Sequence, residues 1–188
     1  MNKILFDIET DGLNPNNIWC IVAKPQGEAP ISFRPKDIEK GIEFLNNAEV
    51  LIGHNITGFD IPVIKRLYGV DLFENKKIED TLIMSRLFNP LREGGHGLKN
   101  WGSIVNFPKA DQPESWDRFT EEMLKYCKQD VVLNSRVYSY LLKEGKDFSK
   151  ESIELEHETS IILRQQERNG FLFNLKKATL LVSSLKER

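Results

Sequence analysis

The order of the apolar segments is the feature that most constrains the fold of this chain. Short apolar runs typical of strands come first, and segments with helical spacing then alternate with them. The predicted strands cover residues 3–7, 18–23, 29–33 and 50–53. The predicted helices cover residues 37–45, 62–68, 81–88, 120–142, 152–169 and 175 onward. This order predicts an α/β domain built on a mixed sheet.

Two polar segments interrupt the pattern. Residues 89–97 are rich in glycine and polar side chains, which predicts a mobile loop. Residues 143–150 are polar and contain Gly145, which predicts a linker or a tight connection. We therefore expect a main domain over residues 1–148 and a helical segment over residues 149–188.

The bulk composition allows a buried core but gives no basic excess. The 188 residues are 40% hydrophobic and carry a formal net charge of −2, whereas tight binding of nucleic acid usually draws on a basic face. If the chain binds nucleic acid, metal ions or a neighbouring domain must supply much of the positive charge.

The sequence also predicts a cytoplasmic protein with no membrane partner. No stretch approaches the ~20 apolar residues of a membrane helix, and Asp7 lies where a signal peptide would have its apolar centre. The two cysteines, Cys20 and Cys127, have no metal-binding spacing and are interpreted as reduced thiols.

Two acidic residues stand together near the end of the first predicted strand. Asp7 and Glu9 are two residues apart, so on a strand both project to the same face. Adjacent carboxylates repel, and the nearest cationic residue in the sequence is Lys3. A divalent cation that prefers oxygen ligands, such as Mg²⁺ or Mn²⁺, would remove the conflict. The alternative is that both acids lie in solvent, or that one of them caps a turn.

A third acid, Asp60, precedes a predicted helix. It follows Phe59 and stands just before Pro62, which is a common position for an aspartate that caps a helix N-terminus. A capping role and a functional role are therefore both open for Asp60.

A tyrosine and a fourth acid share one face of the long predicted helix. Tyr126 and Asp130 are at positions i and i+4, so their side chains point the same way. The alternative is an ordinary pair on a solvated helix face. Cys127 is turned about 100° away from Tyr126 around the helix axis, and we assign it no role.

Taken together, these acids form a known pattern. D-I-E-T at residues 7–10, N-x-x-x-F-D at residues 55–60 and Y-x-x-x-D at residues 126–130 resemble the three exonuclease motifs of the DEDD superfamily. The tyrosine at position 126, with lysine rather than histidine at 125, is similar to the tyrosine branch, which includes the proofreading domains of DNA polymerases. The resemblance covers about residues 3–142.

The C-terminal part carries a second resemblance. Residues 156–171 resemble the segment that leads from exonuclease into polymerase in bacteriophage family A DNA polymerases. This implies that residues 149–188 begin a polymerase region, with the polymerase domain in the same chain or in a separate one. The alternative is an amphipathic helix that packs on the main domain, and both can hold.

The resemblance implies a fold and a set of catalytic residues. The fold is ribonuclease-H-like, with a mixed five-stranded sheet flanked by helices and a C-terminal helical extension. Two divalent cations, Mg²⁺ or Mn²⁺, would be held by four acids: Asp7 between both ions, Glu9 and Asp130 on the first, and Asp60 on the second, largely through water. Tyr126 would orient the attacking water.

The resemblance also implies how substrate is held. Leu13, six residues after Asp7, matches an apolar residue that stacks on the terminal base. Asn55 and His96 are candidates for contacting the 3′ nucleotide or its phosphate, and the alternative for His96 is a loop or helix-cap residue.

Other aromatic and basic residues are interpreted as structural. Phe59 is expected to pack in the core and so position Asp60, and the pair at residues 76–77 is expected to lie in a solvated loop. The three tryptophans are expected to serve packing rather than to hold bases: Trp19, Trp101 and Trp116.

The predicted function is sequence-independent 3′→5′ hydrolysis of single-stranded or mispaired DNA 3′ ends, releasing nucleoside 5′-monophosphates in a phage-infected bacterial host. One alternative is a tyrosine-branch 3′→5′ exoribonuclease. Another is a non-catalytic domain that docks DNA, which the complete set of four acids and the tyrosine argues against.

Overall fold

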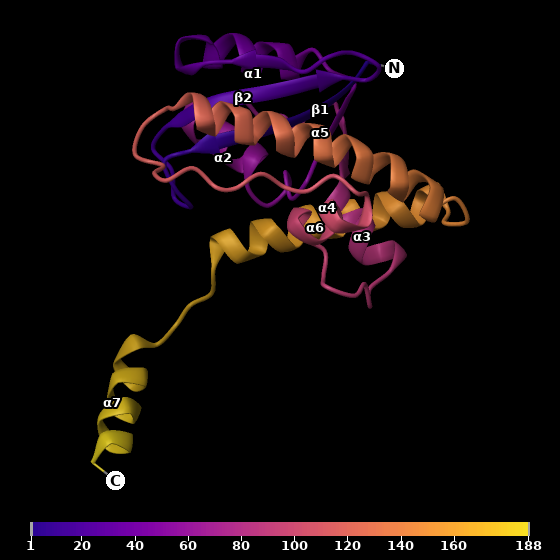
Figure 1. The fold of residues 1–188 in the computed structure, drawn as a ribbon. Coiled ribbons are helices and arrows are strands. Elements are labelled where there is room, and N and C mark those ends of the chain that lie inside the picture. The colour runs from indigo at the N-terminus through magenta and orange to yellow at the C-terminus, as the bar shows by residue number, and fades with distance from the viewer. Residues whose placement is uncertain (1, 188) are drawn as a thin grey trace.

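A single mixed sheet forms the centre of the computed structural model, which describes residues 2–187 (Figure 1). Its strands lie in the order β3-β2-β1-β4-β5. Strand β1 pairs antiparallel with β2 and parallel with β4, and β4 pairs parallel with β5. The strands are β1 (Lys3–Thr10), β2 (Ile18–Pro25), β3 (Ile31–Phe33), β4 (Val50–Gly53) and β5 (Lys77–Asp80). The mixed five-stranded sheet that was predicted is confirmed.

The helices largely follow the sequence pattern. They are α1 (Ile38–Asn46), preceded by a short 3₁₀ turn (Pro35–Asp37), α2 (Asp60–Tyr68), α3 (Thr81–Phe88), α4 (Leu98–Ile104), α5 (Glu121–Glu144), α6 (Lys150–Asn169) and α7 (Leu175–Lys186).

Two elements have no counterpart in the pattern. Strand β5 reads K-I-E-D, so Ile78 is its only apolar residue, and Lys77 belongs to this strand rather than to a solvated loop. Helix α4 has only seven residues, too few to establish a helical period. Both elements are instead stabilised by their neighbours, since β5 pairs with β4 and α4 packs on α5.

The alternation of side chains along β1 assigns the two faces of the sheet. Ile4, Phe6 and Ile8 pack in the core with α1 and α2, whereas Leu5 packs on the opposite face with α5. Figure 1 shows α5 crossing the strands, and it contacts both β1 and β2. Because side chains two apart share a face, Asp7 and Glu9 point toward α5.

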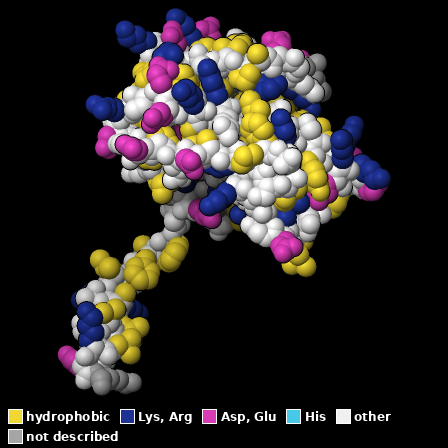
Figure 2. All heavy atoms as spheres, viewed as in Figure 1, with side chains coloured by type: hydrophobic (Ala, Val, Ile, Leu, Met, Phe, Trp, Pro, Cys, Tyr) yellow, Lys and Arg dark blue, Asp and Glu magenta, His cyan; other side chains and the backbone are white. Residues whose placement is uncertain are grey.

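The C-terminal segment behaves differently in its two halves. Helix α6 packs against α3 and β5, and the Nε2 atom of His157 accepts a hydrogen bond from the Asp80 N–H at 2.8 Å. Beyond Gly170 the chain leaves the domain, and α7 projects away from it (Figures 1 and 2). Apolar side chains of residues 171–173 are exposed there, as Figure 2 shows. None of the helices between residues 2 and 187 has the length and apolar character needed to cross a bilayer.

Candidate active site

Asp7 and Glu9 lie side by side on β1, as the strand period predicted. One carboxylate oxygen of each lies within 4.8 Å of the other and of the Cys127 sulfur. Glu9 is only 8% exposed, and Asp7 is partly exposed. Two carboxylates are therefore close together at a largely enclosed place.

Asp60 reaches the same place from α2. It is the first residue of this helix, and the cap position falls on Phe59 without a side-chain cap bond, so the capping interpretation of Asp60 is wrong. Its Oδ1 instead accepts a hydrogen bond from the backbone N–H of Ile8 at 3.2 Å. Ile8 lies between the two acids of β1, so this bond fixes Asp60 beside them.

A buried carboxylate holds the turn that precedes Asp60. Asp80 is fully buried and accepts hydrogen bonds from the backbone N–H groups of Asn55 at 2.8 Å and Thr57 at 3.0 Å. Asn55 adopts a left-handed backbone with φ 64°, a conformation that asparagine tolerates better than most residues. Asp80 thus stabilises the chain reversal between β4 and α2.

The long helix α5 brings the remaining predicted residues to β1. Tyr126, Cys127 and Asp130 all lie on its buried face. The Cys127 sulfur lies 3.6 Å from Asp7 Oδ2, a contact that the helical spacing did not predict. A buried helix face is at least 100° wide, so a residue next to Tyr126 is also able to face the sheet.

The four acids Asp7, Glu9, Asp60 and Asp130, which we call the acidic cluster, are electrostatically unfavourable without a cation. Burial, then Asp60 and Asp130, raise the pKa of Asp7 well above its ordinary value, and burial followed by Asp7 raises the pKa of Glu9 to about 10. Burial raises the pKa of Asp60 to about 7, and it also raises the pKa of Asp130. The four acids cannot all be ionised at neutral pH unless positive charge enters the site.

Lys109 supplies one positive charge, and no motif in the sequence indicates this role. Its Nζ lies 2.6 Å from Asp130 Oδ2 and 4.7 Å from the centre of the Tyr126 ring. Burial alone would lower the pKa of Lys109, but the contact with Asp130 outweighs burial and raises it. Burial raises the pKa of Tyr126 as well, so its hydroxyl stays protonated at neutral pH.

Lys109 belongs to the irregular 105–120 segment between α4 and α5. Gln129 on α5 donates a hydrogen bond to the Pro108 carbonyl at 2.7 Å. A side chain at Gly102 would come within 3.0 Å of the Lys109 backbone nitrogen, so the absence of one lets this segment pass close to α4. These contacts bring Lys109 to the cluster.

A cavity of about 310 Å³ opens beside Glu9. Its lining includes Leu13, which is 94% exposed, together with Phe59 and Trp116. The Trp116 ring meets the Tyr126 ring edge-on, with centroids 5.9 Å apart. We call this hollow the Leu13 cavity. Trp116 and Phe59, which were predicted to serve packing, both line this cavity.

Asn55 and His96 do not line the Leu13 cavity. The side-chain oxygen of Asn55 packs toward Gly58, and the Nδ1 of His96 lies 2.8 Å from the Ser85 hydroxyl. Contact between these two residues and a substrate stays a prediction.

The donor set fits divalent cations. It consists of hard carboxylate oxygens, which suit Mg²⁺ and Mn²⁺, and Asp130 keeps one buried oxygen, Oδ1, without a hydrogen-bond partner. Because a buried acceptor is normally paired, this orphaned oxygen is one that a cation would satisfy.

The sheet order and the acidic cluster define the class of protein: an α/β domain of ribonuclease-H-like fold, with a buried carboxylate site beside an apolar cavity. The fold is similar to that of Brucella melitensis NrnC, at a TM-score of 0.72 and 18% identity over 92% of this chain and 89% of that one. It is also similar to a family B DNA polymerase from Pyrobaculum calidifontis, at a TM-score of 0.60 and 16% identity over 76% of this chain and 24% of that one.

Residues 1–146 match the 3′–5′ exonuclease family, and the chain belongs to that family. The DNA-directed DNA polymerase of Escherichia phage T7 is 26% identical over 98% of this chain and 35% of its own length. The DNA polymerase of Mycobacterium phage L5 is 25% identical over 94% of this chain and 35% of its own length. The chain therefore spans about a third of the length of these relatives. Membership of this DEDD-type family implies divalent metal ions.

Proposed function

We propose that this chain hydrolyses the terminal phosphodiester at the 3′ end of single-stranded or mispaired DNA and releases nucleoside 5′-monophosphates. The observation that carries the proposal is the cluster of four acids, three of them buried, with its orphaned Asp130 oxygen and with Glu9 lining the Leu13 cavity. A phosphodiester placed at the cluster would leave its terminal nucleoside in that cavity.

In this proposal, Asp7, Glu9, Asp60 and Asp130 hold two divalent cations, Mg²⁺ or Mn²⁺. When bound, such ions stabilise the charge on the attacking and leaving oxygens and make hydroxide available near neutral pH. Tyr126 orients the attacking water by a hydrogen bond. Its phenol stays protonated at neutral pH and therefore cannot accept the proton of that water.

Selectivity for frayed ends follows from the shape of the site. Leu13 and Trp116 provide apolar surface on the cavity, on which an unpaired base can stack. A base in a duplex would first have to be unstacked and unpaired, which costs least at a mispaired or single-stranded end. Asn55 and His96 remain candidates for contacts with the 3′ nucleotide.

The phage relatives support a polymerase context. They match almost the whole chain and extend well beyond it. We propose that residues 1–148 form the exonuclease domain and that residues 149–188 connect it to a polymerase domain, in the same chain or in a separate one. The exposed apolar side chains at residues 171–173 are suited to pack against that domain.

The test is hydrolysis of a 5′-labelled single-stranded oligonucleotide. With Mg²⁺ we expect stepwise shortening from the 3′ end and release of mononucleotides, and with EDTA we expect neither. Asp7→Ala and Asp130→Ala should abolish cleavage while circular dichroism shows an intact fold, and the exposed control Asp147→Ala should cleave as the wild type does. Cleavage that survives EDTA, or cleavage from the 5′ end, would refute the mechanism.

RNA is a second candidate substrate, because the fold resembles that of NrnC, a protein seen bound to pGG. Parallel digestion of DNA and RNA strands of the same sequence separates the two candidates. Faster cleavage of RNA would assign the chain to RNA trimming and leave the roles of the acids as proposed.

A further inference from the structure

In the proposed function, the Leu13 cavity receives the terminal nucleoside, so the rest of the strand must follow another surface. A second hollow of about 590 Å³ is the larger of the two and includes Leu13 and Phe59 in its own lining. It runs between α2 and the C-terminal half of α6, and we call it the α2–α6 groove. The two hollows are therefore neighbours, with Leu13 and Phe59 lining both of them.

The groove is basic, although the chain as a whole is slightly acidic. Lys65 and Arg66 line it from α2 and Arg168 from α6, against one acid, Asp71. Lys65 pairs with Asp71, and Arg66 donates to the backbone carbonyl of Pro15. Arg168 is exposed and makes no ion pair among residues 2–187. The lining thus carries an excess of positive charge, with one guanidinium free for a ligand.

The groove also offers ring surface. Phe59 lies at its active-site end and Phe73 farther along, and both are partly exposed. Proteins that bind single strands without sequence preference combine a positively charged groove with aromatic side chains on which bases stack. The α2–α6 groove has both properties.

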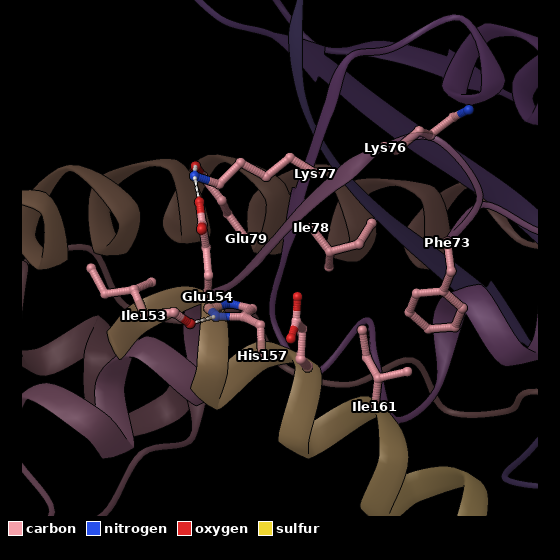
Figure 3. A pocket seen from close by; sticks show the side chains of 10 residues that line it. Phe73, Lys76, Lys77, Ile78, Glu79, Ile153, Glu154, His157 and Ile161 are labelled. Atoms are coloured by element: carbon pink, nitrogen blue, oxygen red, sulfur yellow. Dashed lines mark hydrogen bonds and ion pairs between the residues drawn. The ribbon is translucent and has the colours of Figure 1, made fainter. Parts of the chain in front are cut away.

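The α6 wall of the groove is fixed to the catalytic centre. His157 and Ile161 project from α6 toward β5, as Figure 3 shows. The Asp80 N–H donates to His157, and the Asp80 carboxylate holds the backbone of Asn55 and Thr57 ahead of Asp60. The position of α6 is therefore tied, through one buried residue, to the turn that places a cluster acid.

We propose that the α2–α6 groove binds the sugar–phosphate backbone of the nucleotides that precede the 3′-terminal one, with Arg168 contacting a phosphate. This inference rests on the proposed function, since it takes the end of the strand to lie in the Leu13 cavity. It makes α6 part of the substrate site and not only a connection to a following domain.

Binding can be measured apart from cleavage. Fluorescence anisotropy in EDTA would compare a labelled single strand of about 12 nucleotides with a labelled dinucleotide, for the wild type, Arg168→Ala and Lys150→Ala. Lys150 is an exposed residue at the other end of α6, about 27 Å from Arg168 at the helical rise, so its variant matches the loss of charge without touching the groove.

We expect Arg168→Ala to weaken binding of the long strand about fivefold relative to the dinucleotide, and to lower the slope of log Kd against log salt by about 0.7. Lys150→Ala should bind as the wild type does. Long-strand binding that is unchanged in Arg168→Ala, or a wild type with no salt-dependent binding, would overturn the groove proposal. If the groove instead contacts a protein domain, long-strand binding should likewise be unchanged in Arg168→Ala.

The proposed function fails by a different measurement. If the wild type binds the long strand through Arg168 but hydrolyses nothing in Mg²⁺, the catalytic proposal is wrong and the groove stands. If it hydrolyses single strands while Arg168→Ala binds normally, the catalytic proposal stands and the groove is wrong.

Discussion

Replacing Glu9 with glutamine removes one carboxylate from the cluster with almost no change in shape, and we expect the metal-free protein to become more stable. Burial and then Asp7 raise the pKa of Glu9 from 4.5 to about 10. Between these two values the folded protein keeps a proton on Glu9 that the unfolded chain releases. Stability from a raised pKa is fully present below the lower value and is lost as the pH rises through this window.

The size of the effect follows from the width of the window. Each pH unit inside it costs the wild type about 1.4 kcal/mol, so about 3 kcal/mol is lost between about pH 6 and pH 8. The glutamine side chain does not titrate, so Glu9→Gln keeps that stability. In a domain of this size, the difference in Tm between variant and wild type should widen by about 6–12 °C over the same range.

The assay is thermal unfolding followed by circular dichroism in EDTA, at about pH 6, 7 and 8. The other three acids are present in both proteins, so most of their own pH dependence cancels in the difference. Glu28→Gln, at an exposed turn, is the matched control and should follow the wild type at every pH. Added Mn²⁺ should raise the Tm of the wild type more than that of Glu9→Gln, because the variant has lost a proposed ligand.

A Tm difference that stays constant with pH would refute the reasoning, because it would show that Glu9 does not carry a raised pKa in the folded protein. A variant that is less stable than the wild type at every pH would show that the carboxylate is satisfied by the protein itself.

Two further variants test how the site is held together. Lys109→Met removes the ammonium that lies 2.6 Å from Asp130. We expect Mn²⁺ to bind this variant more tightly in calorimetry, because the ion no longer competes with the ammonium for that carboxylate. Lys109→Arg should bind Mn²⁺ as the wild type does, and weaker binding by Lys109→Met would contradict the competition. His157→Leu leaves the buried Asp80 N–H without its acceptor and should lower the free energy of unfolding in urea by about 1–3 kcal/mol. A substitution at the exposed Thr159 should leave that free energy unchanged. An unchanged free energy in His157→Leu would mean that α6 is not anchored through this bond.

The sequence by itself determined the parts of the site that depend on local backbone geometry. The two-residue period of a strand places Asp7 and Glu9 side by side, and the helical period places Tyr126 and Asp130 on one face. The arrangement of these residues agrees with that geometry, because side-chain direction within a regular element follows from its repeat alone.

Only the tertiary structure decided which residues join these two pairs. Lys109 and Trp116 come from the irregular 105–120 segment, where no repeat fixes the direction of a side chain, and their positions follow from contacts with α4, α5 and β2. Asp60 had two interpretations from sequence, and its bond to Ile8 on a distant strand, in place of a cap bond, excludes the capping one.

The same limit explains the two elements that the pattern did not predict. Strand β5 has a single apolar residue and is defined by its pairing with β4, and the seven residues of α4 are too few to reveal a period. Local periodicity is encoded within a few consecutive residues, whereas edge strands, short helices and irregular segments are stabilised by partners far away in the chain. The sequence therefore determined the acids and the directions in which they point. The tertiary structure determined the position of the Lys109 ammonium, the cavity and the groove around them.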